Sequence, residues 1–174
     1  DSYQISCPPE LKRSHCNENT LSVSGVGYFL NGKPLFENVS LEAKPGQVVI
    51  VKGPSGSGKS TLLDILCGFK RASIGEIWLN GVNLSETGVS ARTGIFSFVP
   101  QFCYLFGRSI GEAVGGVVFD HHTVCKLLEV VGLNDLSPQT MLTSGGTNLS
   151  GGERQRIGIA RALYQNTPVL VLDE

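Results

Sequence analysis

A glycine-rich loop in the first third of the chain offers the most specific chemistry. Glycines let backbone N–H groups converge on an anion with no Cβ in the way, and the helical pattern after the loop adds the positive end of a helix. Lys59 would then reach the β- and γ-phosphates of a nucleotide, while the Ser60 hydroxyl would ligate Mg²⁺. The spacing therefore predicts a nucleoside triphosphate site, whatever process uses it. The loop and its first helical residues are Gly53, Pro54, Ser55, Gly56, Ser57, Gly58, Lys59, Ser60 and Thr61.

A second candidate anion site lies in residues 149–156, which read Leu-Ser-Gly-Gly-Glu-Arg-Gln-Arg. Ser150 offers a hydroxyl, and Gly151 and Gly152 offer uncovered N–H groups at the start of a helical pattern. An ordinary Ser-Gly-Gly helix cap would look the same over these three residues. The segment alone therefore leaves both interpretations open.

Two carboxylates, Asp173 and Glu174, follow the apolar run of residues 169–172. Such a run is typical of a buried strand, and it would place the carboxylates at the C-terminal end of that strand. Any buried strand that runs into a solvated loop can end in the same way. The pattern is informative because the glycine-rich loop lies upstream of it.

The elements that must position these residues follow from periodicity and turn residues. Residues 47–52 are a β-branched run, expected to form a strand buried on both faces of a mixed or parallel sheet. Residues 60–69 are expected to be helical, so the glycine-rich loop would join a strand to a helix. Asn-Gly pairs predict tight turns, and Asp120 is a candidate helix N-cap. We expect further strands at residues 21–26, 34–42, 75–81, 95–99 and 169–172, helices at 109–115, 123–131 and 151–164, and a mostly helical insert over 102–148.

Composition limits the class of protein. A chain of 174 residues with 41% apolar content suffices for one sizeable core. The net charge is −1 and no stretch packs five or six Lys or Arg together, so a nucleic-acid partner is not expected. No apolar run approaches the roughly 20 residues that cross a bilayer. Residues 1–20 lack a signal-peptide pattern, which favours a cytosolic protein, and the five cysteines fit neither a disulfide framework nor a zinc site.

Together these segments resemble the nucleotide-binding domain of ATP-binding cassette (ABC) ATPases. The loop resembles their Walker A motif, residues 149–163 their signature and the following helix, and residues 169–174 their Walker B motif. The resemblance covers residues 21–174, with residues 1–20 as an extension. It implies an α/β P-loop NTPase core sheet, a small antiparallel β element and a helical subdomain at about residues 102–150.

The resemblance implies ATP and Mg²⁺ as cofactors and gives roles to single residues. Asp173 would hold Mg²⁺ through water, together with Ser60, and Glu174 would be the general base. Gln101 follows a predicted strand, as in the family's Q-loop, and would reach the metal and the attacking water. Tyr28 stands where the family stacks an aromatic ring on adenine. Phe29 competes for that role, and a plain core position is the alternative for both.

The resemblance also implies two kinds of partner. Ser150, Gly151 and Gly152 would contact ATP held by a second nucleotide-binding domain, in a head-to-tail homo- or heterodimer. Transmembrane domains would keep the protein at the cytoplasmic face of the cell membrane. No nucleic-acid partner is implied.

Residues 101–113 resemble the exporter pattern, which favours ATP-driven export or flipping. Ser144 stands where many exporters carry a glutamate before the signature, and the insert is somewhat short. Export of a polysaccharide, a lipid-linked sugar or a peptide therefore stays open. The alternatives are a soluble ABC ATPase of DNA repair, chromosome maintenance or translation and, from another class, a P-loop kinase or GTPase, which would leave residues 149–156 unexplained.

The family's switch histidine and D-loop follow its catalytic glutamate. His15, His121 and His122 all precede residues 169–174. The resemblance thus predicts a longer parent protein, cut just after Walker B. We expect ATPase activity in the parent and impaired hydrolysis in the present chain.

Overall fold

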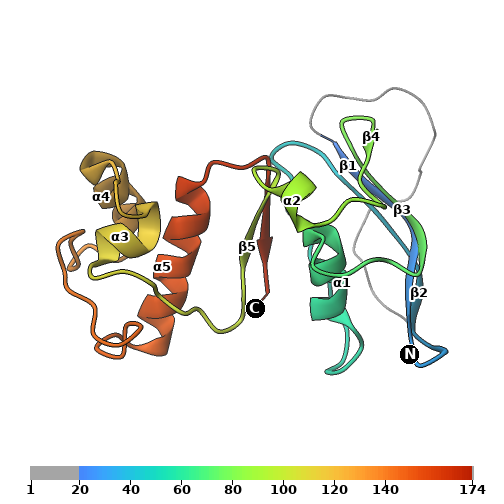
Figure 1. Ribbon diagram of the computed structural model, residues 1–174, viewed down its shortest axis with the longest axis horizontal. Helices are drawn as coiled ribbons and strands as arrows, with labels where there is room; N and C mark the ends of the chain where they lie inside the picture. The colour runs from blue at the N-terminus through green and yellow to red at the C-terminus, as the bar shows by residue number, and fades with distance from the viewer. Residues whose placement is uncertain (1–19, 174) are drawn as a thin grey trace. The chain divides into compact units, whose positions relative to one another are not determined.

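The computed structural model describes residues 20–173 (Figure 1). They fall into two compact units, one ending at Thr93 and one beginning at Gly94. This boundary differs from the helical subdomain expected at about residues 102–150. The proposed extension, apart from Thr20, and the proposed base Glu174 lie outside the described residues.

The first unit is built on a four-stranded antiparallel sheet with the order β2-β1-β3-β4. Its strands are β1 (Leu21–Leu30), β2 (Lys33–Ala43), β3 (Ile74–Leu79) and β4 (Val82–Asn83). Asn31-Gly32 and Asn80-Gly81 join neighbouring strands, and all four residues have positive φ, as two-residue hairpin turns require. The predicted small antiparallel element is confirmed and is larger than expected.

Two helices complete the first unit. Helix α1 (Lys59–Cys67) begins directly after the glycine-rich loop and buries Leu62, Ile65 and Leu66, as its periodicity predicted. Helix α2 (Val89–Arg92) was not predicted, because four residues are too few for a periodic pattern.

The buried strand expected at residues 47–52 is not formed. Only Val51 makes a bridge there, while Val48 is 86% and Ile50 52% exposed. A strand in the middle of a sheet depends on hydrogen bonds to a neighbour on each side. The described residues do not supply such a ladder, so this prediction is wrong for the chain as described.

The second unit combines a two-stranded sheet with three helices. Strands β5 (Phe96–Val99) and β6 (Val169–Leu172) pair in parallel. Helix α5 (Gly151–Tyr164) packs on β5, α3 (Ile110–Gly115) and α4 (His121–Val130). Ser109 and Asp120 cap α3 and α4 by accepting a backbone N–H. The core between these helices includes Leu105, Ile110, Val114, Val124, Leu128, Ile157 and Ala160.

Two expectations for the second unit need correction. Strand β6 is buried only at Val171, while Leu170 is 39% and Leu172 49% exposed, because β6 has one neighbour in its sheet. Within the insert, only α3 and α4 are helical among the described residues, and loops form the larger part. None of the helices in residues 20–173 is long and apolar enough to span a bilayer.

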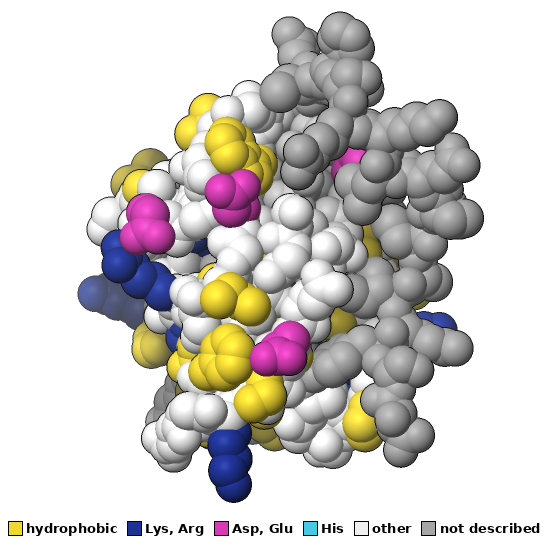
Figure 2. All heavy atoms as spheres, turned by 90° about the vertical axis from the view of Figure 1, so that its right-hand side faces the viewer, with side chains coloured by type: hydrophobic (Ala, Val, Ile, Leu, Met, Phe, Trp, Pro, Cys, Tyr) yellow, Lys and Arg dark blue, Asp and Glu magenta, His cyan; other side chains and the backbone are white. Residues whose placement is uncertain are grey.

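Figure 2 views the side on which the antiparallel sheet lies. There, the hydrophobic side chains of the described residues form small groups separated by charged and polar atoms. Scattered exposed apolar residues of this kind are normal on a protein surface.

Candidate nucleotide site

The phosphate loop, residues 53–60, lies in the first unit and ends in a helix with an uncapped N-terminus. Gly58 is the N-cap of α1 in the left-handed conformation, with φ +92°, and in this described helix no side chain caps it and no acidic residue stands in the first turn. Gly56 also has positive φ. The first N–H groups of α1 therefore point out of the helix with its positive dipole end behind them, which is the arrangement that binds a phosphate.

Gly58 is required for a second reason. A Cβ at this position would lie 2.8 Å from Phe36 and 3.0 Å from Leu35, two β2 side chains. Neither residue is predictable from the sequence, because the contact joins segments that local patterns do not connect. The close approach fixes the end of the phosphate loop against the sheet.

Tyr28 lies beside this contact. It faces Phe36 across β1 and β2, with ring centroids 6.4 Å apart and an interplanar angle of 29°. Phe36 also lies against the end of the phosphate loop. The Phe36 ring therefore connects Tyr28 to the loop within the same unit. Phe29 pairs with Pro34 instead. The geometry favours Tyr28 over Phe29 as the aromatic residue beside the phosphate loop.

Lys59 folds back over the loop. Its Nζ donates to the carbonyl oxygens of Gly53 and Pro54, both at 3.0 Å. These bonds hold the loop closed around the ammonium group. A phosphate oxygen at the helix N-terminus would compete for that ammonium with a full negative charge, which makes the stronger hydrogen bond. Ser60, the next residue, is exposed at the first turn of the helix.

Gln101 and Asp173 occupy the carboxyl edge of the parallel strands in the second unit. Val99 pairs with Leu172, and the backbone N–H of Asp173 continues the ladder to the Val99 carbonyl at 2.9 Å. Asp173 directly follows Leu172, and Gln101 follows Val99 after Pro100. The structure thus brings Gln101 and Asp173 to one edge, where α/β sheets commonly bind ligands.

The candidate anion site at α5 is closed by its own side chains. The Ser150 Oγ accepts the Glu153 N–H at 3.2 Å, and the Glu153 carboxylate accepts both the Ser150 N–H and its hydroxyl at 2.7 Å. These bonds form a capping box. Hydrogen bonds from Ser150 lower the pKa of Glu153. The carboxylate therefore already occupies the positive end of α5, where Gly151 and Gly152 begin the helix.

An alternation of exposed and buried residues follows Gln101. Cys103 and Leu105 are buried, whereas Phe102, Tyr104 and Phe106 are 71–77% exposed. The Arg161 Nη1 donates to the Tyr104 carbonyl at 3.2 Å, and Cys103 packs against Gly158. Both contacts come from α5, which therefore fixes the backbone of residues 102–106. Three aromatic rings are thereby presented to solvent next to Gln101. The sequence signals this surface by an aromatic residue at every second position, 102, 104 and 106.

Comparison with known families gives one assignment for most of the chain. Residues 36–174 match the family described as "ABC transporter". This range includes the phosphate loop, Gln101, the signature segment of residues 149–156 and Asp173. Tyr28 precedes it.

Individual relatives agree with this match. A mycobactin import ATP-binding/permease protein, IrtB, of Mycolicibacterium thermoresistibile is 33% identical, over 89% of this chain and 28% of its own length. An ATP-dependent lipid A-core flippase of Polaromonas sp. is 36% identical, over 93% of this chain and 28% of its own. A solved bacterial Atm1-family ABC exporter with ATP bound superimposes with a TM-score of 0.75 at 25% identity, covering 95% of this chain and 31% of that one. The chain thus spans less than a third of the length of each of these relatives.

Proposed function

The chain belongs to the ABC transporter family, and we propose that it is the ATP-binding and ATP-hydrolysing part of an exporter-type transporter. The observation that carries the proposal is the phosphate loop at an uncapped helix N-terminus, with Lys59 held at its mouth. The fold of the chain matches that of an ABC exporter. The soluble ABC ATPase is less favoured, because relatives named as a flippase and a permease protein match over most of the chain.

The candidate residues provide the oxygen ligands that Mg²⁺ prefers. Ser60 supplies a hydroxyl, Gln101 an amide oxygen and Asp173 a carboxylate. When bound, Mg²⁺ would neutralise charge on the β- and γ-phosphates. Lys59 and the loop N–H groups bind and orient the phosphates, and Tyr28 stacks on the base. Glu174 polarises the attacking water, a role that rests on its place after Asp173 in the sequence.

Two partners complete the proposed mechanism. A second nucleotide-binding domain carries the ATP that meets Ser150, Gly151 and Gly152, after the Glu153 carboxylate has turned away. Transmembrane domains contact the surface that Phe102, Tyr104 and Phe106 present, because exposed aromatic side chains favour a protein interface. Such domains would hold the chain at the cytoplasmic face of a membrane. We propose export or flipping as the direction, while one relative carries an import name.

Nucleotide binding tests the proposal in the present chain. We expect Lys59→Ala to weaken Mg-ATP binding by about 100-fold, since charge-assisted contacts contribute about 1.5–3 kcal/mol each. Isothermal calorimetry measures this loss. Lys44→Ala, which removes an exposed lysine of the same unit, is the matched control and should bind as the wild type does. Equal affinity of wild type and Lys59→Ala would refute the assignment of the loop.

A further inference from the structure

Arg92 is a buried cation in the first unit that none of the motifs includes. Its side chain is 3% exposed. Burial lowers the pKa of Arg92, yet a guanidinium stays protonated in proteins. A buried charge needs compensating hydrogen bonds, because desolvation of an ion is costly. The partners of Arg92 therefore indicate what it stabilises.

The guanidinium binds the C-terminal end of α1, the helix that begins at the phosphate loop. Its Nη1 donates to the carbonyl oxygens of Ile65 and Leu66, both at 2.5 Å. The last turn of α1, as described, has no basic residue of its own. Arg92 supplies from α2 the positive charge that the negative end of a helix favours. Gly68 leaves room for it, because a Cβ there would lie 2.9 Å from the Arg92 Cδ.

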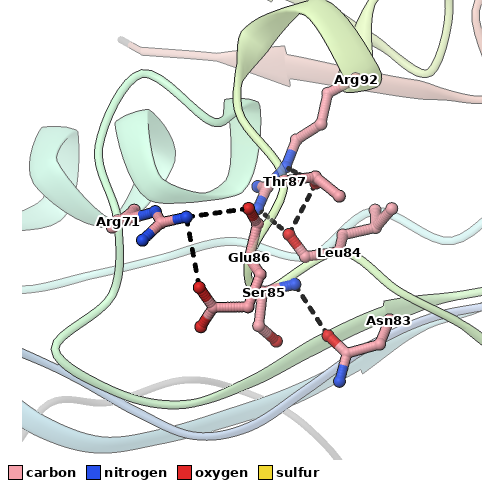
Figure 3. A network of polar contacts seen from close by, with 7 residues as sticks. All are labelled: Arg71, Asn83, Leu84, Ser85, Glu86, Thr87 and Arg92. Atoms are coloured by element: carbon pink, nitrogen blue, oxygen red, sulfur yellow. Dashed lines mark hydrogen bonds and ion pairs between the residues drawn. The ribbon is translucent and has the colours of Figure 1, made fainter.

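The same guanidinium also binds the turn after β4 (Figure 3). Its Nη2 donates to the Leu84 carbonyl, and its Nε donates to the Thr87 Oγ1 at 3.1 Å. This turn is joined to the sheet, since the Leu84 N–H donates to the Ile77 carbonyl at 2.7 Å. Arg92 thus connects the sheet to the far end of α1 through a continuous series of hydrogen bonds.

We propose that Arg92 is a positioning residue for the phosphate loop, an inference that rests on the proposed nucleotide site. Helix α1 has only 9 residues, about 13 Å at 1.5 Å per residue. A rigid rod of that length moves its N-terminal donors when its C-terminal end shifts. Gly58 fixes one end against Leu35 and Phe36, and Arg92 fixes the other. Misplacement of binding groups by about 1 Å is enough to weaken an interaction strongly.

The test compares two arginines of one network. Arg92→Met removes the buried guanidinium but keeps an apolar stem, and Arg92→Lys keeps a cation that cannot bridge the helix and the turn. Arg71→Gln is the matched control, because Arg71 donates to the carbonyl of Glu86 in the same turn from a side chain that is 71% exposed. Binding of Mg-ATP and of tripolyphosphate is measured at a temperature where circular dichroism shows each variant fully folded. A purely structural role would lower stability and leave these dissociation constants unchanged.

We expect Arg92→Met to raise both dissociation constants about tenfold and Arg92→Lys to raise them less, with Arg71→Gln within twofold of wild type. The losses should be equal for the two ligands, because the hydrogen bonds of Arg92 do not include Tyr28, the residue proposed to stack on the base. If Arg92→Met fails to fold, Thr87→Val replaces it, because this variant removes the acceptor of the Arg92 Nε. It should still weaken the binding of both ligands by about threefold. Wild-type affinity for both ligands in folded Arg92→Lys and Thr87→Val would overturn the inference. A wild-type chain that binds neither ligand would instead overturn the proposed function.

Discussion

The helices α1 and α5 both have glycines at their N-termini, and these termini are built in opposite ways. At α1 the N-cap is Gly58, with no side-chain cap and no acidic residue in the described first turn. At α5 the N-cap is Ser150, and a capping box with Glu153 satisfies the backbone N–H groups of these two residues. Among the described residues, the first helix has no side-chain cap at its N-terminus, whereas at the second the Ser150 hydroxyl and the Glu153 carboxylate each accept the other residue's backbone N–H.

This difference separates the two steps of the proposed function. An anion can bind at α1 when the Lys59 ammonium exchanges two carbonyl oxygens for phosphate. At α5 an anion must first displace the Glu153 carboxylate, which is itself negatively charged and hydrogen-bonded. Nucleotide binding to the loop should therefore precede any engagement of the α5 terminus.

The largest effect should come from a side chain at the α1 terminus. We expect Gly58→Ala to lower the free energy of unfolding by about 3 kcal/mol, through left-handed strain and overpacking against Phe36 and Leu35. Gly56→Ala is the control, since Gly56 has positive φ but nothing within 4 Å of a Cβ, and should cost about 1 kcal/mol. Urea denaturation measures both. Equal losses would show that the contact with β2 is unimportant.

A smaller loss is expected at the α5 terminus. Ser150→Ala removes the N-cap and should lower the free energy of unfolding by about 1 kcal/mol. Ser90→Ala, at an exposed serine inside α2, provides the control and should change little. If Ser150→Ala were as stable as the wild type by urea denaturation, the capping box would not stabilise this helix.

The smallest effect should be a pH dependence at Glu153. Because its folded pKa is lowered, the carboxylate stabilises the folded state above its unfolded pKa of about 4.5. That stabilisation disappears as the pH falls through the folded pKa. We expect Glu153→Gln to melt below the wild type at pH 7 and to approach it below pH 4, as thermal denaturation would record. If the difference in melting temperature between wild type and Glu153→Gln grew as the pH fell, the stabilisation would have the opposite pH dependence from the one expected here.

Local signals in the sequence predicted the elements that depend on few residues. The Asn31-Gly32 turn, the Asp120 cap and the whole of α5 are confirmed. Each is set by backbone conformations or hydrogen bonds within a few residues. The Ser-x-x-Glu pattern at Ser150 is likewise a local signal, typical of a capping box.

Features that depend on distant segments could not be predicted in this way. Residues 47–52 have strand propensity, but a β-ladder also requires hydrogen bonds to neighbouring strands, and residues 47–52 do not form such a ladder with the described residues. The contact of Gly58 with Phe36 joins the loop to β2, and Arg92 is a single arginine whose partners come from two separate segments. The sequence therefore predicted the chemistry of the nucleotide site, whereas the contacts of Gly58 and Arg92 that support the site are seen only in the structure.

Backbone amide chemical shifts during a nucleotide titration test the central difference between the two termini. With ¹⁵N-labelled protein and increasing Mg-ATP, the amides of residues 56–61 should shift first and saturate. Those of Gly151, Gly152 and Glu153 should stay unchanged over the same range, because the capping box of Ser150 and Glu153 closes this helix terminus. Shifts at residues 151–153 that precede those of the phosphate loop, or a loop that does not respond, would contradict the account.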